Sequence, residues 1–268
     1  MVAGSPGLIP FTSGKPSKRR YDTVTMWVDH FSRFLYAHCQ EDATAKTTLE
    51  SKIGFESFAK RYSVSIKHIH ADNGVFASKA FQDHVDASEQ HQSFCGVGAH
   101  WQNGVIERFI GVITTRARTM LLHAMDQWPD VITAEFWSFA FMHAVRLHNC
   151  TPRPGTSESP FTLFSNEDSP LSPTDFRVFG SPVYVLDSTL QSGTIGPGKW
   201  KDRCHLGAYI GHSPNHASNV ILVYNPKTRL VSPQYHVVHD ESFETVNIKT
   251  SEADAQVKLD SMLDALFM

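Results

Sequence analysis

The chain has 268 residues, a length that suits one large domain or two of ordinary size. Hydrophobic residues make up 41% of it and charged residues 19%, a globular composition that excludes a wholly disordered chain. The formal net charge of −3 excludes a uniformly basic nucleic-acid-binding surface, so any contact with DNA must come from local patches.

The first half of the sequence predicts alternating strands and helices. Residues 1–20 are rich in Gly, Pro and Ser and indicate a loop. Runs of β-branched and aromatic residues predict strands over 21–31 and 33–39, which a tight turn would join as a hairpin. A helix over 42–62, a strand over 64–72, a short helix over 78–90 with Ser78 as N-cap, and a strand over 92–97 are expected to follow.

The second half begins with a glycine-rich stretch over 96–104, which predicts a mobile loop. Apolar residues at intervals of three and four predict a long helix over 105–124, and a second helix is expected over 131–148. Short strand-like segments then recur between turns. We therefore expect an α/β fold with a loop at 1–20, a core at 21–150, a linker at 151–174, a β-rich module at 175–246 and a tail at 247–268.

The cysteines and the hydropathy pattern narrow the class of protein further. The four cysteines are far apart and form no Cys-x-x-Cys pair, which favours reduced thiols and argues against a cysteine-based zinc site. No apolar run reaches the roughly 18 residues that a membrane-spanning helix needs. We therefore expect no membrane partner.

The stretch HIHADNGVF, residues 68–76, ends a predicted strand in a carboxylate. Asp72 precedes Asn-Gly, so one interpretation is a turn aspartate that binds its own backbone. In a second interpretation His68, His70 and Asp72 share one face of the strand and bind zinc, because the pattern resembles the H-x-H-x-D motif of metallo-β-lactamases. That motif continues with a further histidine, where this chain has Asn73.

A third interpretation pairs Asp72 with Glu107, which lies 35 positions later in the first turn of the predicted long helix. A carboxylate there also stabilises the helix N-terminus, and this is the simpler explanation of Glu107. In an α/β sheet, however, an intervening helix and strand can bring Glu107 back to the carboxyl end of the Asp72 strand, where such folds build their sites.

Several stretches together resemble a copia-type retrotransposon integrase. IKHIHADNGVF and HWQNGVIERFIGVITTRARTML resemble the second and third acidic motifs of its Asp-Asp-Glu catalytic core, and YDTVTMWVDHFSRFLYAH resembles the second and third strands of that core. FRVFGSPVYV, HLGAYIGHSPN and VSPQYHVVHDESF resemble the β-rich segment that follows the core in copia-type Pol polyproteins. The resemblance spans about residues 20–246 and implies a ribonuclease H-like integrase core followed by a small β-rich module.

The resemblance also implies an activity and its partners. The family joins element 3′ ends to target DNA by polynucleotidyl transfer that depends on Mg²⁺ (or Mn²⁺), and carboxylates are the ligands that Mg²⁺ prefers. Asp72 and Glu107 then stand as the second and third acids, and Gln102 and Asn103 as contacts to the DNA end. The implied partners are DNA and further copies of the chain in a homo-oligomer, and the implied location is the nucleus.

One departure from the family concerns the first acid. Its expected place falls just before Met1, so we expect a core that lacks its first strand, with unpaired backbone groups at the facing strand edges and no activity. Asp29 and Asp22 are the possible replacements, but Asp29 matches an acid of the family's second strand. The family's His/Cys zinc module is also absent. A non-enzymatic DNA-binding remnant therefore stays an alternative, beside the zinc metallohydrolase that would use His68, His70 and Asp72.

Basic residues supply the expected DNA contacts. Arg108, Arg116 and Arg118 lie on the predicted long helix, and Arg118 shares the face of Glu107 because eleven positions make about three turns. A solvated helix face explains the same residues without DNA. The basic run KPSKRR at 15–20 is a candidate DNA contact or nuclear signal, although a charged loop is the simpler explanation. In the β-rich module, a DNA- or partner-binding surface would use Arg177, Lys199, Lys201 and Arg203.

Overall fold

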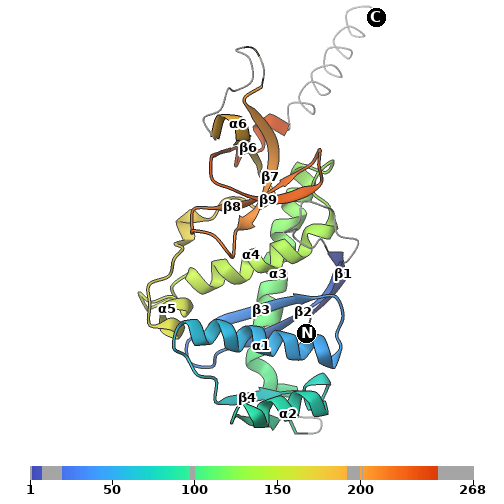
Figure 1. Cartoon of the computed structure of the whole chain (residues 1–268), viewed down its shortest axis with the longest axis vertical. Helices are drawn as coiled ribbons and strands as arrows, with labels where there is room; N and C mark the ends of the chain where they lie inside the picture. The colour runs from blue at the N-terminus through green and yellow to red at the C-terminus, as the bar shows by residue number, and fades with distance from the viewer. Residues whose placement is uncertain (1, 8–19, 97–99, 192–199, 201, 247–268) are drawn as a thin grey trace, which may run out of the picture. The chain divides into compact units, whose positions relative to one another are not determined.

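The computed structural model describes residues 2–7, 20–96, 100–191, 200 and 202–246 (Figure 1). The chain divides into two compact units. Unit 1 comprises Met1–Thr119 and Ala134–Phe176, and unit 2 comprises Met120–Thr133 and Arg177–Met268. Among the described residues, no helix is both long enough and apolar enough to span a membrane.

The first sheet of unit 1 contains the predicted hairpin. Strands β2 (Tyr21–Val28) and β3 (Leu35–Gln40) pair in antiparallel fashion, with Val28 opposite Leu35. Residues 2–7, which we expected to be loop, instead form β1 (Val2–Gly7) and pair with the start of β2 from Tyr21 to Val24. Glycine and proline are tolerated in such an edge strand, which explains why composition alone was misleading.

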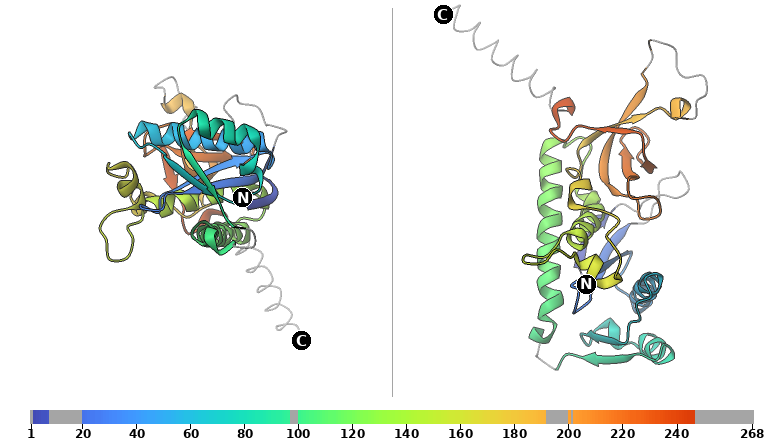
Figure 2. Two further views of the ribbon diagram at one scale, coloured as in Figure 1. Left: turned by 90° about the horizontal axis from the view of Figure 1, so that it is seen from below. Right: turned by 90° about the vertical axis from the view of Figure 1, so that its left-hand side faces the viewer.

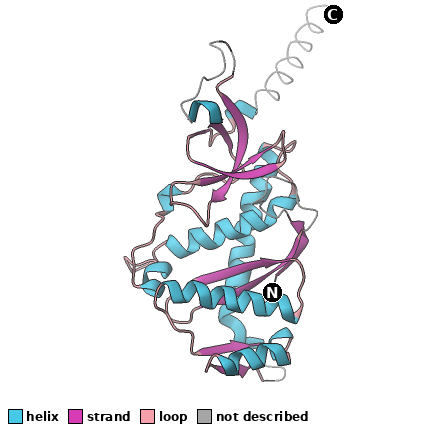
Figure 3. Ribbon diagram, in the orientation of Figure 1, coloured by secondary structure: helices cyan, strands magenta, loops and turns pink. Residues whose placement is uncertain are grey.

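The second sheet of unit 1 is parallel, and Figure 3 shows its strands apart from those of the first sheet. Among the described residues it contains β4 (His68–Ala71) and β5 (His91–Phe94), which are joined through η1 (Val75–Ala77) and α2 (Lys79–Ala87). Ser78 is the N-cap residue of α2 as predicted, although its side chain makes no capping hydrogen bond. Both strands are shorter than the sequence pattern indicated, because only four residues of each find a partner.

Helices cover both sides of these strands. Figure 2 shows α1 (Ala45–Arg61) and α2 on one side and α3 (Gly104–Gln127) on the other. The short helix η2 (His100–Asn103) leads into α3, whose residues up to Thr119 belong to unit 1. η3 (Ala134–Phe136) and α4 (Trp137–Cys150) follow, so the second helix begins later than predicted.

The expected linker at 151–174 is part of unit 1 instead. It contains α5 (Pro160–Ser165) and η4 (Pro173–Asp175). Phe161 and Phe164 of α5 are buried in one cluster with Phe34 of the hairpin and Phe55 of α1. The polar composition around α5 masked two aromatic residues whose burial stabilises the fold by about 1.5–3 kcal/mol each.

Unit 2 is built on an antiparallel five-stranded sheet in the order β10-β6-β7-β8-β9. Its core contains Val183, Val185, Tyr209, Ile221 and Val223. The end of α3, from Met120, also belongs to this unit. The strands are β6 (Pro182–Leu186), β7 (Cys204–His212), β8 (Ile221–Asn225), β9 (Leu230–Gln234) and β10 (Val237–His239), and α6 (Ser188–Gln191) follows β6.

Candidate metal and nucleic-acid site

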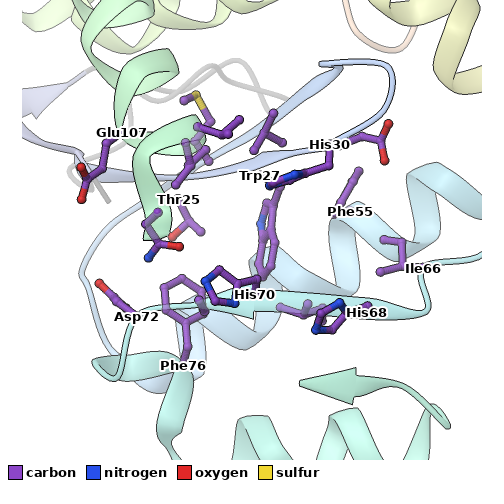
Figure 4. Close-up of a pocket in the computed structure, with 18 of the residues that line it drawn as sticks. Thr25, Trp27, His30, Phe55, Ile66, His68, His70, Asp72, Phe76 and Glu107 are labelled. Atoms are coloured by element: carbon purple, nitrogen blue, oxygen red, sulfur yellow. The ribbon is translucent and has the colours of Figure 1, made fainter. Parts of the chain in front are cut away.

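A cavity of about 810 Å³ lies in unit 1 (Figure 4). Residues Thr25 to His30 of the hairpin line one part of it, and the run from Val64 to Asp72 lines another. The start of α3 and the aromatic side chains of Phe55, Phe76 and Phe164 complete its walls. The cavity therefore brings together segments that lie far apart in the sequence.

Asp72 and Glu107 both line this cavity. Asp72 follows β4 directly, and its Oδ1 accepts a hydrogen bond from Gly74 N at 3.4 Å, so it also serves the turn that the first interpretation predicted. Glu107 lies in the first turn of α3. In Figure 4 both carboxylates lie at the same end of the cavity, next to Thr25. The two acids thus line one cavity, and their action as a metal-binding pair stays a prediction.

The two carboxylates suit a divalent cation. Both side chains are exposed, and among the described residues neither forms an ion pair with a lysine, arginine or histidine. Mg²⁺ is usually held by one or two carboxylates, with water and substrate phosphate oxygens as the remaining ligands. Two open carboxylates beside a cavity fit that requirement.

The histidines of β4 have a different set of partners. His68 and His70 share the exposed face of the strand, and Ser93 Oγ lies 2.8 Å from His68 Nε2 and 2.8 Å from His70 Nδ1. Cys95 Sγ lies 3.5 Å from His70 Nε2. In the part of the chain that the structure describes, no three His, Cys, Asp or Glu side chains form a group that could hold a metal ion. Among these residues, His68, His70 and Asp72 therefore do not form the set of three ligands that the zinc interpretation requires.

Gln102 and Asn103 line the same cavity from η2. The side-chain oxygen of Gln102 accepts a hydrogen bond from Gly96 N at 2.8 Å, which links the end of the β5 segment to the start of α3. Residues 97–99 of the glycine-rich stretch lie outside the described residues, so its predicted mobility stays a prediction. The amide groups of both side chains remain candidates for polar contacts with DNA.

The arginines of α3 are separate from the cavity. Arg108, Arg116 and Arg118 are exposed, and none of them is among the residues that line it.

Lys67 does line the cavity, and it is an exposed cation that sequence reasoning did not single out. The feature of the sequence that could have identified Lys67 is its position in the strand-like run that ends at Asp72.

The other basic positions differ in their surroundings. Arg177 Nη1 lies 3.2 Å from Glu241 Oε1, so that guanidinium is already paired with a carboxylate. Arg203 is exposed. Lys199, Lys201 and residues 15–19 of the basic run lie outside the described residues.

Asp29 has a structural role that competes with metal binding. It lines the cavity, but its Oδ2 accepts hydrogen bonds from Ser32 N at 2.7 Å and from Ser32 Oγ at 2.6 Å. These bonds close the turn between β2 and β3. Asp22 is exposed and is not among the lining residues. Neither acid joins Asp72 and Glu107 as an open third carboxylate.

Comparisons with known proteins complete the description of the chain. No protein-family model matches it. It is similar to a chain of the simian T-cell lymphotropic virus intasome in complex with PP2A regulatory subunit B56 gamma, with 16% identity, a TM-score of 0.45, and coverage of 88% of this chain and 76% of that chain. It is also similar to the HTLV-2 integrase catalytic core domain in complex with magnesium. The trimeric form gives 20% identity and a TM-score of 0.42 over 60% of this chain and 93% of that chain. The dimeric form gives 22% identity and a TM-score of 0.41 over 56% and 88%. Because these TM-scores lie below 0.5, the proposals below rest on the residues of the site.

Proposed function

We propose that unit 1 is an integrase-type core that acts on DNA, in which Asp72 and Glu107 hold Mg²⁺ (or Mn²⁺). The observation that carries this proposal is the convergence of two open carboxylates, 35 positions apart, on one cavity. The resemblance of both motifs to a copia-type integrase supports the same assignment and extends it to an origin in a Pol polyprotein.

Each residue has a distinct part in this function. When bound, Mg²⁺ would neutralise the charge that develops on the attacking and leaving oxygens of a phosphodiester. The turn at Asn73 and Gly74 holds Asp72 at the end of β4, and the first turn of α3 holds Glu107. Lys67 is placed to attract a phosphate, since it lines the same cavity.

Further parts of the proposal concern the partners. Gln102 and Asn103 would donate hydrogen bonds to the DNA end, and Arg108, Arg116 and Arg118 would contact phosphates outside the cavity. Action on chromosomal DNA implies a nuclear location, and joining two element ends implies more than one copy of the chain. Unit 2 would serve as the small β-rich module of the family.

The number of carboxylates suggests how the activity is limited. Among the described residues, Asp72 and Glu107 are the open acids of the site, while the family uses three. We therefore expect metal binding and DNA binding, but little strand transfer until a third carboxylate is supplied. A protein that only binds DNA is the alternative that the same experiments distinguish.

Metal titration tests the assignment directly. Calorimetric titration with Mg²⁺ and Mn²⁺ should show binding to the wild-type chain that weakens at least tenfold, about 1.4 kcal/mol, in Asp72→Asn and in Glu107→Gln. Asp83→Asn removes an exposed acid from α2 and is the matched control, which should bind as the wild type does. Equal metal binding in the double variant Asp72→Asn/Glu107→Gln would overturn the proposal.

A second experiment separates catalysis from binding. Oligonucleotides with free 3′ ends are incubated with target DNA and Mg²⁺, and both the bound fraction and the joined product are measured. The assay is run on this chain and on a longer chain in which an upstream segment with the family's first acid has been added. DNA binding by both chains without any joined product would favour the DNA-binding alternative. Joined product that is lost in Glu107→Gln supports the integrase assignment.

A further inference from the structure

Two arginines and a histidine of unit 1 form a cationic cluster away from the cavity. His148 lies in the last turn of α4, and its ring contacts that of Phe109 in α3, with the centroids 5.2 Å apart. Burial lowers the pKa of His148, its hydrogen bond to Arg33 O opposes that shift, and the nearby charges of Arg116 and Arg153 lower the pKa further. Neither His148 nor the arginines Arg116 and Arg153 line the cavity. The cluster therefore lies where α3 meets the end of α4.

The two guanidinium groups have no carboxylate partner in the described part of the chain. Neither Arg116 nor Arg153 forms an ion pair or a side-chain hydrogen bond with another described residue. The Nε of Arg153 is buried and also has no hydrogen-bond partner among them. A buried charged donor is normally paired, because it has given up its hydrogen bonds to water. The cluster therefore offers strong donors to an anion.

The backbone at Arg153 is held in place by its neighbours. Pro152 and Pro154 flank it, and each proline fixes its own φ and restricts the residue before it. Thr156 closes a turn, since its N and its Oγ1 donate hydrogen bonds to Arg153 O at 3.0 and 3.1 Å. Gly155 supplies the left-handed position of this turn, with a φ of +81°. A backbone that is already ordered lowers the entropy cost of binding a ligand.

The hydrogen bond of His148 determines its tautomer. Nε2 lies 3.1 Å from Arg33 O, and a carbonyl oxygen only accepts, so Nε2 carries the proton of the neutral ring. Nδ1 is then an acceptor, and it becomes a second N–H donor when the ring takes up a proton. Among the described residues no side chain or backbone group bonds to Nδ1. A protonated His148 therefore adds a third positive charge and a further donor to the cluster.

These groups suit a phosphate group with two negative charges. A guanidinium carries its charge throughout the physiological pH range, and its parallel N–H donors match the oxygens of phosphate. A terminal phosphate monoester has a charge of about −1.5 to −2 at pH 7, whereas a phosphodiester of a nucleic-acid backbone has a single negative charge. Two arginines and a histidine that takes up a proton therefore match a dianion better than a backbone phosphate.

We propose that Arg116, Arg153 and His148 form a binding site for a phosphate dianion, either free phosphate or the terminal phosphate monoester of a nucleic acid. The two guanidinium groups bind phosphate oxygens, and the protonated ring of His148 donates from Nδ1. The bound anion offsets the repulsion among the cations, so anion binding and proton uptake by His148 favour each other. The site requires no metal ion, and it does not depend on the proposed function of the cavity.

Calorimetric titration with sulfate and with inorganic phosphate, without Mg²⁺ and at constant ionic strength, tests the site. Each anion should bind the wild type saturably. Binding should weaken about tenfold in Arg116→Ala and in Arg153→Ala, because each change removes charge-assisted hydrogen bonds. Arg61→Ala, at an exposed position on α1, is the charge-matched control and should bind as the wild type does.

The outcome is decided by the variant that is expected to fold. Thermal unfolding shows whether Arg153→Ala, which loses a partly buried side chain, is folded. Arg116 is exposed, so Arg116→Ala decides the question if Arg153→Ala does not fold. No saturable binding of either anion to the wild type, or equal binding by the wild type and a folded Arg116→Ala, would overturn the proposal.

An NMR titration of the His148 ring gives a readout that a purely structural role would not change. Sulfate should raise the pKa of His148, since a bound anion favours the charged ring. Sulfate keeps both of its charges while histidine titrates, so its affinity for the wild type should rise as the pH falls from 8 to 5. His148→Gln cannot take up a proton and should show nearly constant affinity. A pKa of His148 that sulfate leaves unchanged would contradict the site.

Two oligonucleotides that differ only in a 5′-phosphate distinguish the sources of the phosphate. If a nucleic-acid end is the ligand, the 5′-phosphorylated strand should displace sulfate about tenfold better than the strand with a 5′-hydroxyl. If inorganic phosphate displaces sulfate and neither strand does, the ligand is free phosphate. Strong and equal displacement by both strands would show that backbone phosphodiesters occupy the site, and the proposed preference for a dianion would then be wrong.

Discussion

The side chain of Asn149 in α4 binds both backbone groups of Leu35 in β3. Its Oδ1 accepts a hydrogen bond from Leu35 N at 2.9 Å, and its Nδ2 donates one to Leu35 O at 2.7 Å. Both residues are buried. The amide of Asn149 therefore replaces a neighbouring strand at the start of β3 and joins α4 to the hairpin that lines the cavity.

Loss of this pair of bonds should destabilise unit 1. Asn149→Ala leaves Leu35 N and Leu35 O buried and unpaired, and each such group costs about 1–3 kcal/mol. We expect urea denaturation to show a loss of about 2–6 kcal/mol in the free energy of unfolding. Asn215→Ala, at an exposed position, should stay within about 0.5 kcal/mol of the wild type. A loss below 1 kcal/mol in Asn149→Ala would show that water replaces the amide.

Gly180 in unit 2 should tolerate no side chain. Its φ is +77°, and a Cβ there would lie 2.4 Å from the Cβ of Ala124. Gly180→Ala combines left-handed strain of about 1–2 kcal/mol with overpacking of about 1–3 kcal/mol. Gly155 has a φ of +81° with nothing within 4 Å, so Gly155→Ala isolates the strain. Equal destabilisation of the two variants, measured by amide exchange in each unit, would contradict the steric argument.

The stability of unit 1 should depend on His148. Burial lowers the pKa of His148, its hydrogen bond to Arg33 O opposes that shift, and the charges of Arg116 and Arg153 lower the pKa further. The folded state therefore binds this proton more weakly than the unfolded chain, whose histidines titrate near about 6.5. Stability should fall as the pH drops through that value, until the pH reaches the lower folded pKa.

His148→Gln tests this dependence without removing the donor. The amide nitrogen of Gln can replace Nε2, which lies 3.1 Å from Arg33 O, but Gln cannot take up the proton. The free energy of unfolding, measured between pH 8 and 5, should fall less steeply in the variant. Burial also lowers the pKa of His38, so His38→Gln/His148→Gln should flatten the curve further. If the free energy of unfolding depends on pH equally in the variant and the wild type, the pKa of His148 is not lowered by folding.

The arginines of α3 should determine how DNA binding depends on salt. If Arg108, Arg116 and Arg118 contact phosphates, each Arg→Ala change should lower the slope of log K against log salt concentration by about 0.9. Arg61→Ala, at an exposed position on α1, is the charge-matched control and should leave the slope unchanged. Equal slopes for all four variants would show that these arginines lie on a solvated helix face and do not contact DNA.

Local patterns predicted most of the helices and strands. The β-branched run before Asp29 predicted the β2–β3 hairpin, and the apolar spacing predicted α1 and α3. These patterns reflect hydrogen bonds and side-chain spacing within a few residues, which the sequence displays directly. The pairing of Asp72 with Glu107 required a further assumption, namely that the chain between them returns to the same sheet edge.

Other features depended on contacts between distant residues. The segment that we predicted to be a linker is part of the core, because its Phe161 and Phe164 pack against Phe34 and Phe55 of earlier elements. β1 formed in a Gly/Pro-rich segment because β2 offered a free edge. Neither outcome is visible within a window of ten residues.

The sequence by itself determined which carboxylates are candidates for chemistry, since Asp72 and Glu107 stand out by their turn and helix contexts. Only the tertiary structure decided that they share a cavity and that Asp29 accepts hydrogen bonds from Ser32. The physical reason is that the walls of a cavity come from segments that only long-range packing brings together, whereas turns and helix ends are set by the residues beside them.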